Sequence, residues 1–167
     1  KSRPNLYDLS LRVPALARWP GVIKPGTRIE DTASHLDLFP TLVEIAKADH
    51  PSDLPLRGNS LVPLLQGERP SSWKQDLYTQ YSMINYAVAT LRSYRTQNYK
   101  LIRDFHNQGC DEFFDLRSDP SESNNLINDP RPEIQTMIKA MDTKLHNRAN
   151  QIGDSDVIHS HHIKAQR

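Results

Sequence analysis

Histidine and cysteine side chains are the obvious candidates for metal binding or nucleophilic chemistry in this sequence. His159, His161 and His162 form a short tract near the C-terminus that could bind a transition metal, but incidental histidines in a tail are the simpler interpretation. Cys110 is the single cysteine, so it cannot form an internal disulfide bond, and no Cys/His spacing builds a zinc site. We therefore interpret Cys110 as a thiol beside a strand, without a catalytic role.

Two further groups of residues have types that could serve acid–base chemistry or sugar binding. His35 lies close to Asp37, but residues two apart do not share a helix face, which argues against a catalytic dyad. Tyr78, Tyr81 and Tyr86 lie in a β-rich stretch, where alternating tyrosines are more often packing residues. We keep Tyr81 and Tyr86 as candidates for the rim of a substrate site.

The charge of the chain excludes some classes of function. Lys and Arg together number 21 and Asp and Glu 20, so the net charge is +1 with both signs mixed along the chain. Nucleic-acid binding therefore has no support, because it usually requires a clustered basic face. No apolar run approaches the roughly 18 residues of a membrane span. The sequence starts without Met or a signal peptide, so we expect the natural start, and any targeting signal, to lie upstream.

Residues 1–70 read as the C-terminal end of an α/β core. The apolar run 13–19 is closed by two Pro-Gly dipeptides, which predicts a strand. Apolar residues with helical spacing after Asp37, the expected N-cap, predict a helix that packs on a sheet. These residues are Leu38, Leu42 and Ile45, widened by Phe39, Val43 and Ala46. The run 61–66 predicts one helical turn that ends at Gly67.

Residues 71–152 read as a separate C-terminal subdomain. Short β-rich runs at small spacings predict three or four antiparallel strands, with a hairpin turn at Gln97-Asn98. An amphipathic helix follows and should cover one face of this sheet, giving an α/β to α+β fold. Its expected buried residues are Ile134, Ile138, Met141 and Leu145. Residues 153–167 have no periodicity and are expected to form a mobile tail.

Five runs of the sequence carry a resemblance to one family. In order along the chain they are LYDLSLRVPALARWPG, HLDLFPTLVEIA, LRGNSLVPLLQG, LRSYRTQNYKLI and EFFDLRSDPSESNNL. Together they cover about residues 6–145 and closely resemble the second half of a type I, formylglycine-dependent sulfatase of the alkaline phosphatase superfamily. A single run would be weak support, whereas five in the correct order make chance resemblance very improbable.

The resemblance implies a sulfate-ester hydrolase whose chemistry lies mainly outside these residues. Such enzymes use a formylglycine nucleophile and a calcium ion, and the Cys/Ser-x-Pro-x-Arg motif that yields the nucleophile is absent here. We therefore expect the calcium ion and formylglycine in an N-terminal catalytic part of the same protein, with no cofactor in this chain. The substrate would be a sulfated small molecule or glycan, and this chain alone should be an inactive fragment.

One catalytic residue of the family could have its counterpart here. Lys1 stands six residues before Tyr7, where the family spacing is more often four, and the resemblance implies that Lys1 contacts the sulfate group in the intact protein. Asp8 occupies the position of a family glutamate, and we expect it to anchor a loop. Arg12 is expected to form a structural salt bridge or to donate to the backbone.

The last of the five runs is expected to lock a turn rather than to carry chemistry. Asp119 before Pro120 favours an Asx-type turn. Glu122, Asn124 and Asn125 are expected to bind the backbone of the turn that follows.

Two alternatives remain open from the sequence. A phosphomono- or phosphodiesterase of the same superfamily would share this scaffold, and the missing nucleophile would distinguish it. A non-catalytic module that binds sulfated glycans is the second alternative, although the near-neutral charge argues against it. Export or a periplasmic location is implied only by the resemblance.

Overall fold

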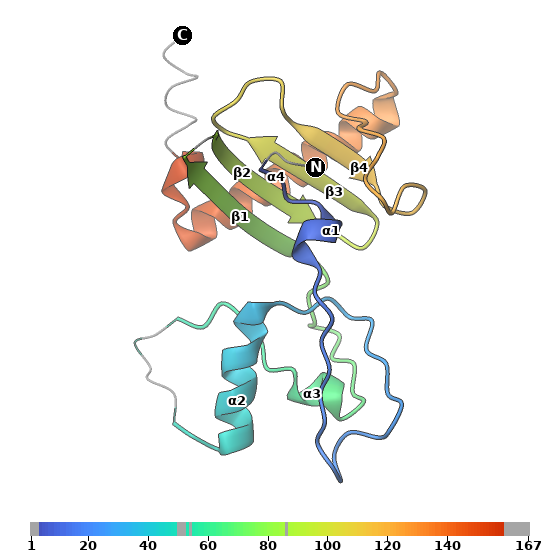
Figure 1. The fold of residues 1–167 in the computed structure, drawn as a ribbon, viewed down its shortest axis with the longest axis vertical. Coiled ribbons are helices and arrows are strands. Elements are labelled where there is room, and N and C mark those ends of the chain that lie inside the picture. Colours follow the sequence, from blue (N-terminus) through green and yellow to red (C-terminus); the bar gives the residue numbers. More distant parts are fainter. Residues whose placement is uncertain (1–3, 50–52, 54, 86, 159–167) are drawn as a thin grey trace. The chain divides into compact units, whose positions relative to one another are not determined.

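The computed structural model describes residues 4–49, 53, 55–85 and 87–158, which form two compact units (Figure 1). The sheet unit comprises Lys1–Val13 and Asp76–Arg167, and the helical unit comprises Pro14–Gln75. This division differs from the predicted one, in which residues 1–70 form one part. The reason is that the N-terminal segment packs into the core of the sheet unit.

A four-stranded antiparallel sheet forms the centre of the sheet unit, with strand order β1-β2-β3-β4. Its strands are β1 (Leu77–Ile84), β2 (Val88–Arg95), β3 (Tyr99–Asp104) and β4 (Glu112–Asp115). β-Branched and aromatic residues recur in all four strands, as the pleated, half-buried surface of a sheet favours. The sheet confirms the prediction from the sequence, including the short turn between β2 and β3.

Helix α4 (Pro132–Ile152) covers one face of this sheet (Figure 1). Pro132 occupies the first turn, where its missing N–H is not needed, and Gly153 ends the helix with a φ of +69°. The helix and the sheet share one hydrophobic core. Its buried members are Leu101, Phe113, Ile138, Met141 and Leu145. The predicted amphipathic helix is thereby confirmed.

The other face of the sheet is covered by the N-terminal segment. Leu6 and Tyr7 are buried there, and the short helix α1 (Asp8–Leu11) follows them. Together with side chains of three strands they form a second core. Its strand members are Ala89, Leu91, Ile102 and Phe114. Strands β2, β3 and β4 therefore contribute alternate residues to two cores, as the two-residue period of a strand requires.

The helical unit contains a 3₁₀ turn, η1 (His35–Asp37), and the helices α2 (Leu38–Ala46) and α3 (Val62–Leu65). Both predicted helices are present, but the N-terminal capping differs. Ser34 caps η1, and the Asp37 carboxylate accepts the Ser34 backbone N–H at 2.7 Å, which completes a capping box.

Two expectations for the helical unit are wrong in this structure. Residues 13–19 form no strand, because none of the described residues pairs with them, and Leu16 is fully exposed. The apolar stripe of α2 is also exposed, with Leu42 at 64%. Within the unit, α2 instead buries Pro40 and Thr41, and the Thr41 hydroxyl accepts the Leu61 N–H at 2.8 Å.

The chain after α4 does not follow the expectation of a tail that begins at Gly153. The Asp154 N–H donates to the Ala149 carbonyl at 2.9 Å, and the chain forms a further helical turn up to Ile158. Asp154 and Val157 are buried. Within the described part of the chain, no helix is both long enough and apolar enough to cross a membrane.

Candidate functional site

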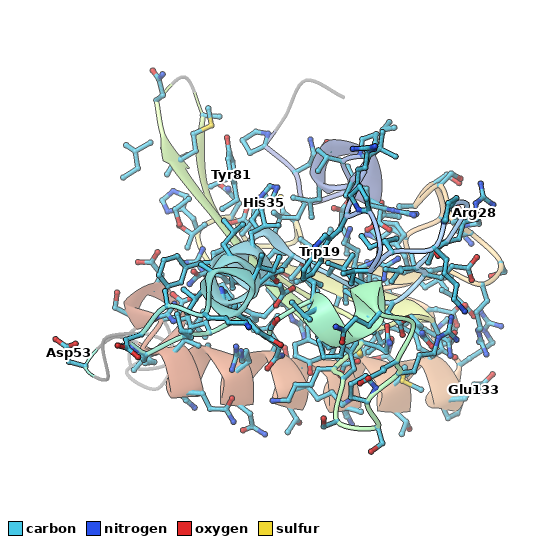
Figure 2. All side chains as sticks on the ribbon, turned by 90° about the horizontal axis from the view of Figure 1, so that it is seen from below. Trp19, Arg28, His35, Asp53, Tyr81 and Glu133 are labelled. Atoms are coloured by element: carbon cyan, nitrogen blue, oxygen red, sulfur yellow. The ribbon has the colours of Figure 1, made fainter. Side chains whose placement is uncertain are left out.

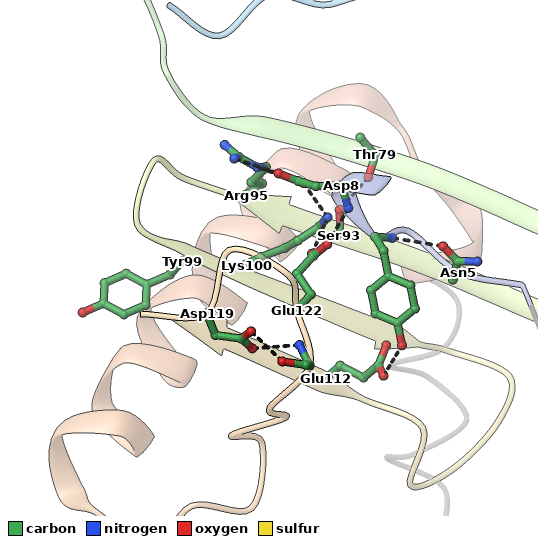
Figure 3. A network of polar contacts seen from close by, with 12 residues as sticks. Asn5, Asp8, Thr79, Ser93, Arg95, Tyr99, Lys100, Glu112, Asp119 and Glu122 are labelled. Atoms are coloured by element: carbon green, nitrogen blue, oxygen red, sulfur yellow. Dashed lines mark hydrogen bonds and ion pairs between the residues drawn. The ribbon is translucent and has the colours of Figure 1, made fainter. Parts of the chain in front are cut away.

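Four ionisable side chains from four separate segments meet beneath the N-terminal segment. They are Asp8 of α1, Arg95 at the end of β2, Lys100 of β3 and Glu122 of the turn after β4, and we call them the buried ion cluster (Figure 3). Arg95 and Lys100 are paired residues in the β2–β3 ladder, so both side chains lie on the sheet face that the N-terminal segment covers.

The charged groups of the buried ion cluster lie within hydrogen-bonding distance of their partners. Lys100 Nζ lies 2.8 Å from Asp8 Oδ1 and 2.8 Å from Glu122 Oε1, and the Lys100 side chain is fully buried. Arg95 donates to both oxygens of the Asp8 carboxylate, with its closest nitrogen at 2.9 Å. The second oxygen of Glu122 accepts the backbone N–H of Asp8. Glu122 therefore holds both the backbone and, through Lys100, the side chain of Asp8.

The electrostatics of the cluster indicate anchoring rather than acid–base chemistry. Two carboxylates face one ammonium and one guanidinium group, so the formal charges cancel. Burial alone would raise the pKa of Asp8, but the hydrogen bonds and charges of Arg95 and Lys100 outweigh it and lower that pKa below 3.8. A carboxylate with a lowered pKa is a poor proton acceptor near neutral pH. Asp8 is therefore the loop anchor that the sequence predicts.

Glu122 corrects one expectation about the C-terminal signature. Its carboxylate reaches back to Lys100 and to the backbone of Asp8, which lies 114 residues earlier. Its backbone has a φ of +55°, which is unfavourable for a residue with a side chain. This conformation directs the chain so that the carboxylate enters the buried ion cluster.

Asp119 and Asn125 lock the turn, as expected, and Asn124 takes part through its backbone N–H. The Asp119 carboxylate accepts the backbone N–H groups of Ser123 and Asn124, both at 2.8 Å. The Asn125 side chain accepts the N–H groups of Phe113 at 2.9 Å and of Ile127 at 3.0 Å. These bonds fix the path that brings the turn back to β4.

Tyr7 binds the N-terminal segment to β4, the strand at one edge of the sheet. Its hydroxyl donates to Glu112 Oε1 at 2.6 Å, and its ring meets Phe114 edge-on at a centroid distance of 6.0 Å. The side chain of Asn5 accepts the Tyr7 N–H at 3.2 Å. The segment that starts with LYD is thus fixed by apolar packing, by hydrogen bonds and by the buried ion cluster.

The remaining predicted site residues are placed only in part. Lys1, Tyr86 and the histidine tract lie outside the described residues. Tyr81 is partly exposed on the β1–β2 hairpin (Figure 2), where its hydroxyl donates to the Met83 sulfur at 3.3 Å. Tyr81 pairs with Leu91 in the β1–β2 ladder, so it shares the sheet face on which the N-terminal segment packs.

A second group of charges, which no sequence pattern predicts, lies on the face of the sheet that α4 covers. Arg92 of β2 is buried and binds Asp154 and Asp156, which follow α4; we call these three residues the Arg92 cluster. Arg92 Nη2 lies 3.0 Å from Asp154 and 2.7 Å from Asp156. The Tyr78 hydroxyl also donates to Asp154, at 2.6 Å. The one signal in the sequence that could have indicated this cluster is the position of Arg92 among the apolar residues of a strand.

The described residues do not fit the calcium ion that the resemblance implies. Within the described ranges, no group of three or more His, Cys, Asp or Glu side chains could hold a metal ion. The carboxylates of both clusters already face arginine or lysine side chains, which would repel a cation. We therefore derive no step through calcium from these residues.

Comparisons with known proteins place this geometry in a family. Residues 3–151 match the family described as "N-sulphoglucosamine sulphohydrolase, C-terminal". An ulvan-active sulfatase of Formosa agariphila is 32% identical over 155 residues, which cover 75% of this chain and 31% of that protein. A solved structure of a protein in complex with its substrate D-glucosamine-2-N,6-O-disulfate is 29% identical with a TM-score of 0.73, covering 83% of this chain and 28% of the other.

The fold alone extends to a neighbouring group of enzymes. A phosphonate monoester hydrolase from Silicibacter pomeroyi superposes with a TM-score of 0.67 at 21% identity, covering 80% of this chain and 28% of that one. This chain thus spans less than a third of the length of these proteins. The family match, the sulfatase relative and the shared fold agree: the chain belongs to the sulfatase family of the alkaline-phosphatase-like superfamily and corresponds to its C-terminal domain.

Proposed function

We propose that this chain serves as the C-terminal domain of a sulfatase that hydrolyses sulfate esters to an alcohol and inorganic sulfate. The match of residues 3–151 to a sulfatase C-terminal family carries the proposal. The buried ion cluster supports it, because it joins the first and the last of the runs that resemble sulfatases. The formylglycine nucleophile and the calcium ion belong, in this proposal, to an N-terminal catalytic part of the same protein.

The helical unit is proposed to bind that N-terminal part. It exposes a large set of apolar side chains, and extensive exposed apolar surface marks an interaction site. The set consists of Leu16, Leu36, Leu38, Phe39, Leu42 and Ile45. Sulfatase relatives are more than three times as long as the aligned region, so they have the additional chain that such a surface would bind.

Lys1 and the tyrosines of the β1–β2 hairpin are the proposed contacts to substrate. Lys1 precedes the firmly anchored segment that begins at Asn5, and we assign it the sulfate contact in the intact protein. Tyr81 and Tyr86 are assigned to the rim of the substrate site, where aromatic rings pack against sugars. Tyr81 has the partial exposure that such a contact requires.

The test uses the full-length protein with its N-terminal part. Turnover is measured with one aryl sulfate and with the matched aryl phosphate and aryl phosphonate. A higher kcat/KM for the sulfate ester, lost on addition of a calcium chelator and restored by calcium, is the expected result. A higher kcat/KM for the phosphate or phosphonate would instead assign the protein to the phosphoesterases of the superfamily.

The assigned sulfate contact has its own variant. Lys1→Ala should lower kcat for the aryl sulfate by about 10²-fold, because it removes a charge that stabilises the transition state. Lys139→Ala, a matched change at an exposed position of α4, should leave kcat unchanged. Equal rates for the two variants would remove Lys1 from the site.

A further inference from the structure

We propose that Glu122 and Lys100 are positioning residues of the enzyme. They hold the backbone of the Tyr7–Asp8 segment in one register on the sheet, and catalytic turnover depends on that register although neither side chain touches the substrate. The inference rests on the proposed sulfatase function and adds to it two residues that act through another segment of the chain.

The contacts of Glu122 constrain the segment in two ways. One carboxylate oxygen accepts the Asp8 N–H, and the other lies 2.8 Å from Lys100 Nζ. Lys100 in turn lies 2.8 Å from the Asp8 carboxylate. A shift of the segment along the sheet by one residue would break both contacts to Asp8, leaving the buried Lys100 ammonium group beside Glu122 alone.

The cluster is a costly means of stabilising a fold, which indicates a different purpose. Buried ion pairs often contribute less stability than apolar residues of the same size, because their desolvation offsets their attraction. The left-handed conformation of Glu122 adds backbone strain, which glycine would avoid. The strain is explained if the carboxylate itself is required at this point, since glycine could form the turn but could not reach Lys100.

The position of the anchored segment explains why turnover should respond. Under the proposed function, the sulfate contact Lys1 stands six residues before Tyr7 in the same N-terminal stretch of chain. Asp8 is the residue at which the backbone is fixed, and the chain leaves the sheet unit only five residues later, after Val13. A displacement of about 1 Å in a group that positions a reaction can lower the rate roughly 10²-fold. Loosening the segment at Asp8 should therefore act on kcat rather than on substrate affinity.

The experiment compares three variants of the full-length enzyme. Glu122→Gln removes the charge and keeps the shape, and Glu122→Gly removes the carboxylate but favours the observed backbone conformation. Glu133→Gln is the matched control, because Glu133 is exposed on α4 (Figure 2). We expect kcat for the aryl sulfate to fall at least about tenfold in both Glu122 variants with KM little changed, and the control to match the wild type.

Hydrogen exchange separates positioning from a loss of folding. In the two Glu122 variants, amides of residues 5–11 should exchange faster, while those of β3 and of α4 keep their protection. Wild-type kcat in both variants would overturn the proposal, and so would accelerated exchange throughout the sheet unit together with the loss of kcat. An absence of aryl sulfate turnover in the wild-type enzyme would instead refute the proposed function itself.

Discussion

Replacing Asp154 by asparagine should release the chain after α4 from the sheet. In the Arg92 cluster, Asp154 is almost completely buried and accepts hydrogen bonds from Arg92, Tyr78 and Gln80. Asparagine has nearly the same shape but no charge. The substitution therefore leaves the buried guanidinium of Arg92 with the partly exposed Asp156 as its charged partner.

The size of the effect follows from the pKa of Asp154. Burial alone would raise this pKa, but the hydrogen bonds from Arg92, Tyr78 and Gln80 lower it from 3.8 to about 2. A difference of nearly two pH units corresponds to about 2 kcal/mol of stability. Removing one partner of a buried ion pair costs about 3–5 kcal/mol, and Asp156 compensates part of this loss. We therefore expect a loss of about 2–4 kcal/mol at neutral pH.

Native-state hydrogen exchange of the intact protein measures this loss. Because about 1.4 kcal/mol corresponds to a factor of ten, the protection of amides in residues 149–158 should fall roughly 30- to 700-fold in Asp154→Asn. The control is Asp129→Asn, since Asp129 also has a pKa lowered to about 2, by the hydrogen bonds of Arg131, but in a pair whose guanidinium is exposed. Water screens that pair, so protection of the amides around it should not change measurably.

The pH dependence of this protection tests whether the charge of Asp154 holds the segment. The folded-state pKa of Asp154 lies below its unfolded value of 3.8, so the carboxylate stabilises the fold fully above about pH 5 and loses this effect as the pH falls toward 2. The difference in protection between the wild type and Asp154→Asn should therefore shrink over this range. A difference that stays constant from neutral pH to pH 2 would show that charge pairing does not hold this segment.

Two further predictions concern packing. Leu145→Ala should lower the free energy of unfolding by about 2–5 kcal/mol, because it opens a cavity between α4 and the sheet. Leu9→Ala, at an exposed position of α1, should leave the free energy of unfolding nearly unchanged. Urea unfolding measures both effects. Gly58→Ala should disrupt the helical unit, since the added Cβ would lie 2.1 Å from the Leu36 carbonyl oxygen. Faster hydrogen exchange in peptides around residues 34–41 would show this disruption. Gly67→Ala, whose Cβ would meet no atom within 4 Å, should cost only about 1 kcal/mol of backbone strain, and equal effects of the two glycine variants would contradict this reasoning.

The sheet and α4 could be predicted because their signals are local. Alternating β-rich runs with turn residues define the strands, and apolar residues at helical spacing define α4. The predicted stripe of α2 is also local and correct as a helix, yet its apolar side chains are exposed in this structure. Periodicity therefore reports which face of a helix is apolar, but it does not report whether the same stretch of chain supplies the surface that covers this face.

The two clusters could not be predicted because their partners are far apart in the sequence. Asp8 meets Lys100 92 residues later, and Arg92 meets Asp154 62 residues later. Isolated lysines and arginines in strands read as surface residues, and no local pattern indicates which carboxylate they face. The left-handed conformation of Glu122 is equally hidden, since glycine is the residue that usually signals such a backbone.

The arrangement of these charges on the sheet connects the two clusters. Arg95 and Lys100 lie on one face, and Arg92 and Arg103 lie on the other, because residues three apart in a strand point to opposite sides. The first pair holds the start of α1 through Asp8, and Arg92 holds the chain after α4. Apolar packing alone would tolerate small shifts of these segments, since it is not directional. Directional contacts to buried cations do not tolerate such shifts. The cations of β2 and β3 therefore fix the register of two segments that lie on opposite faces of the sheet.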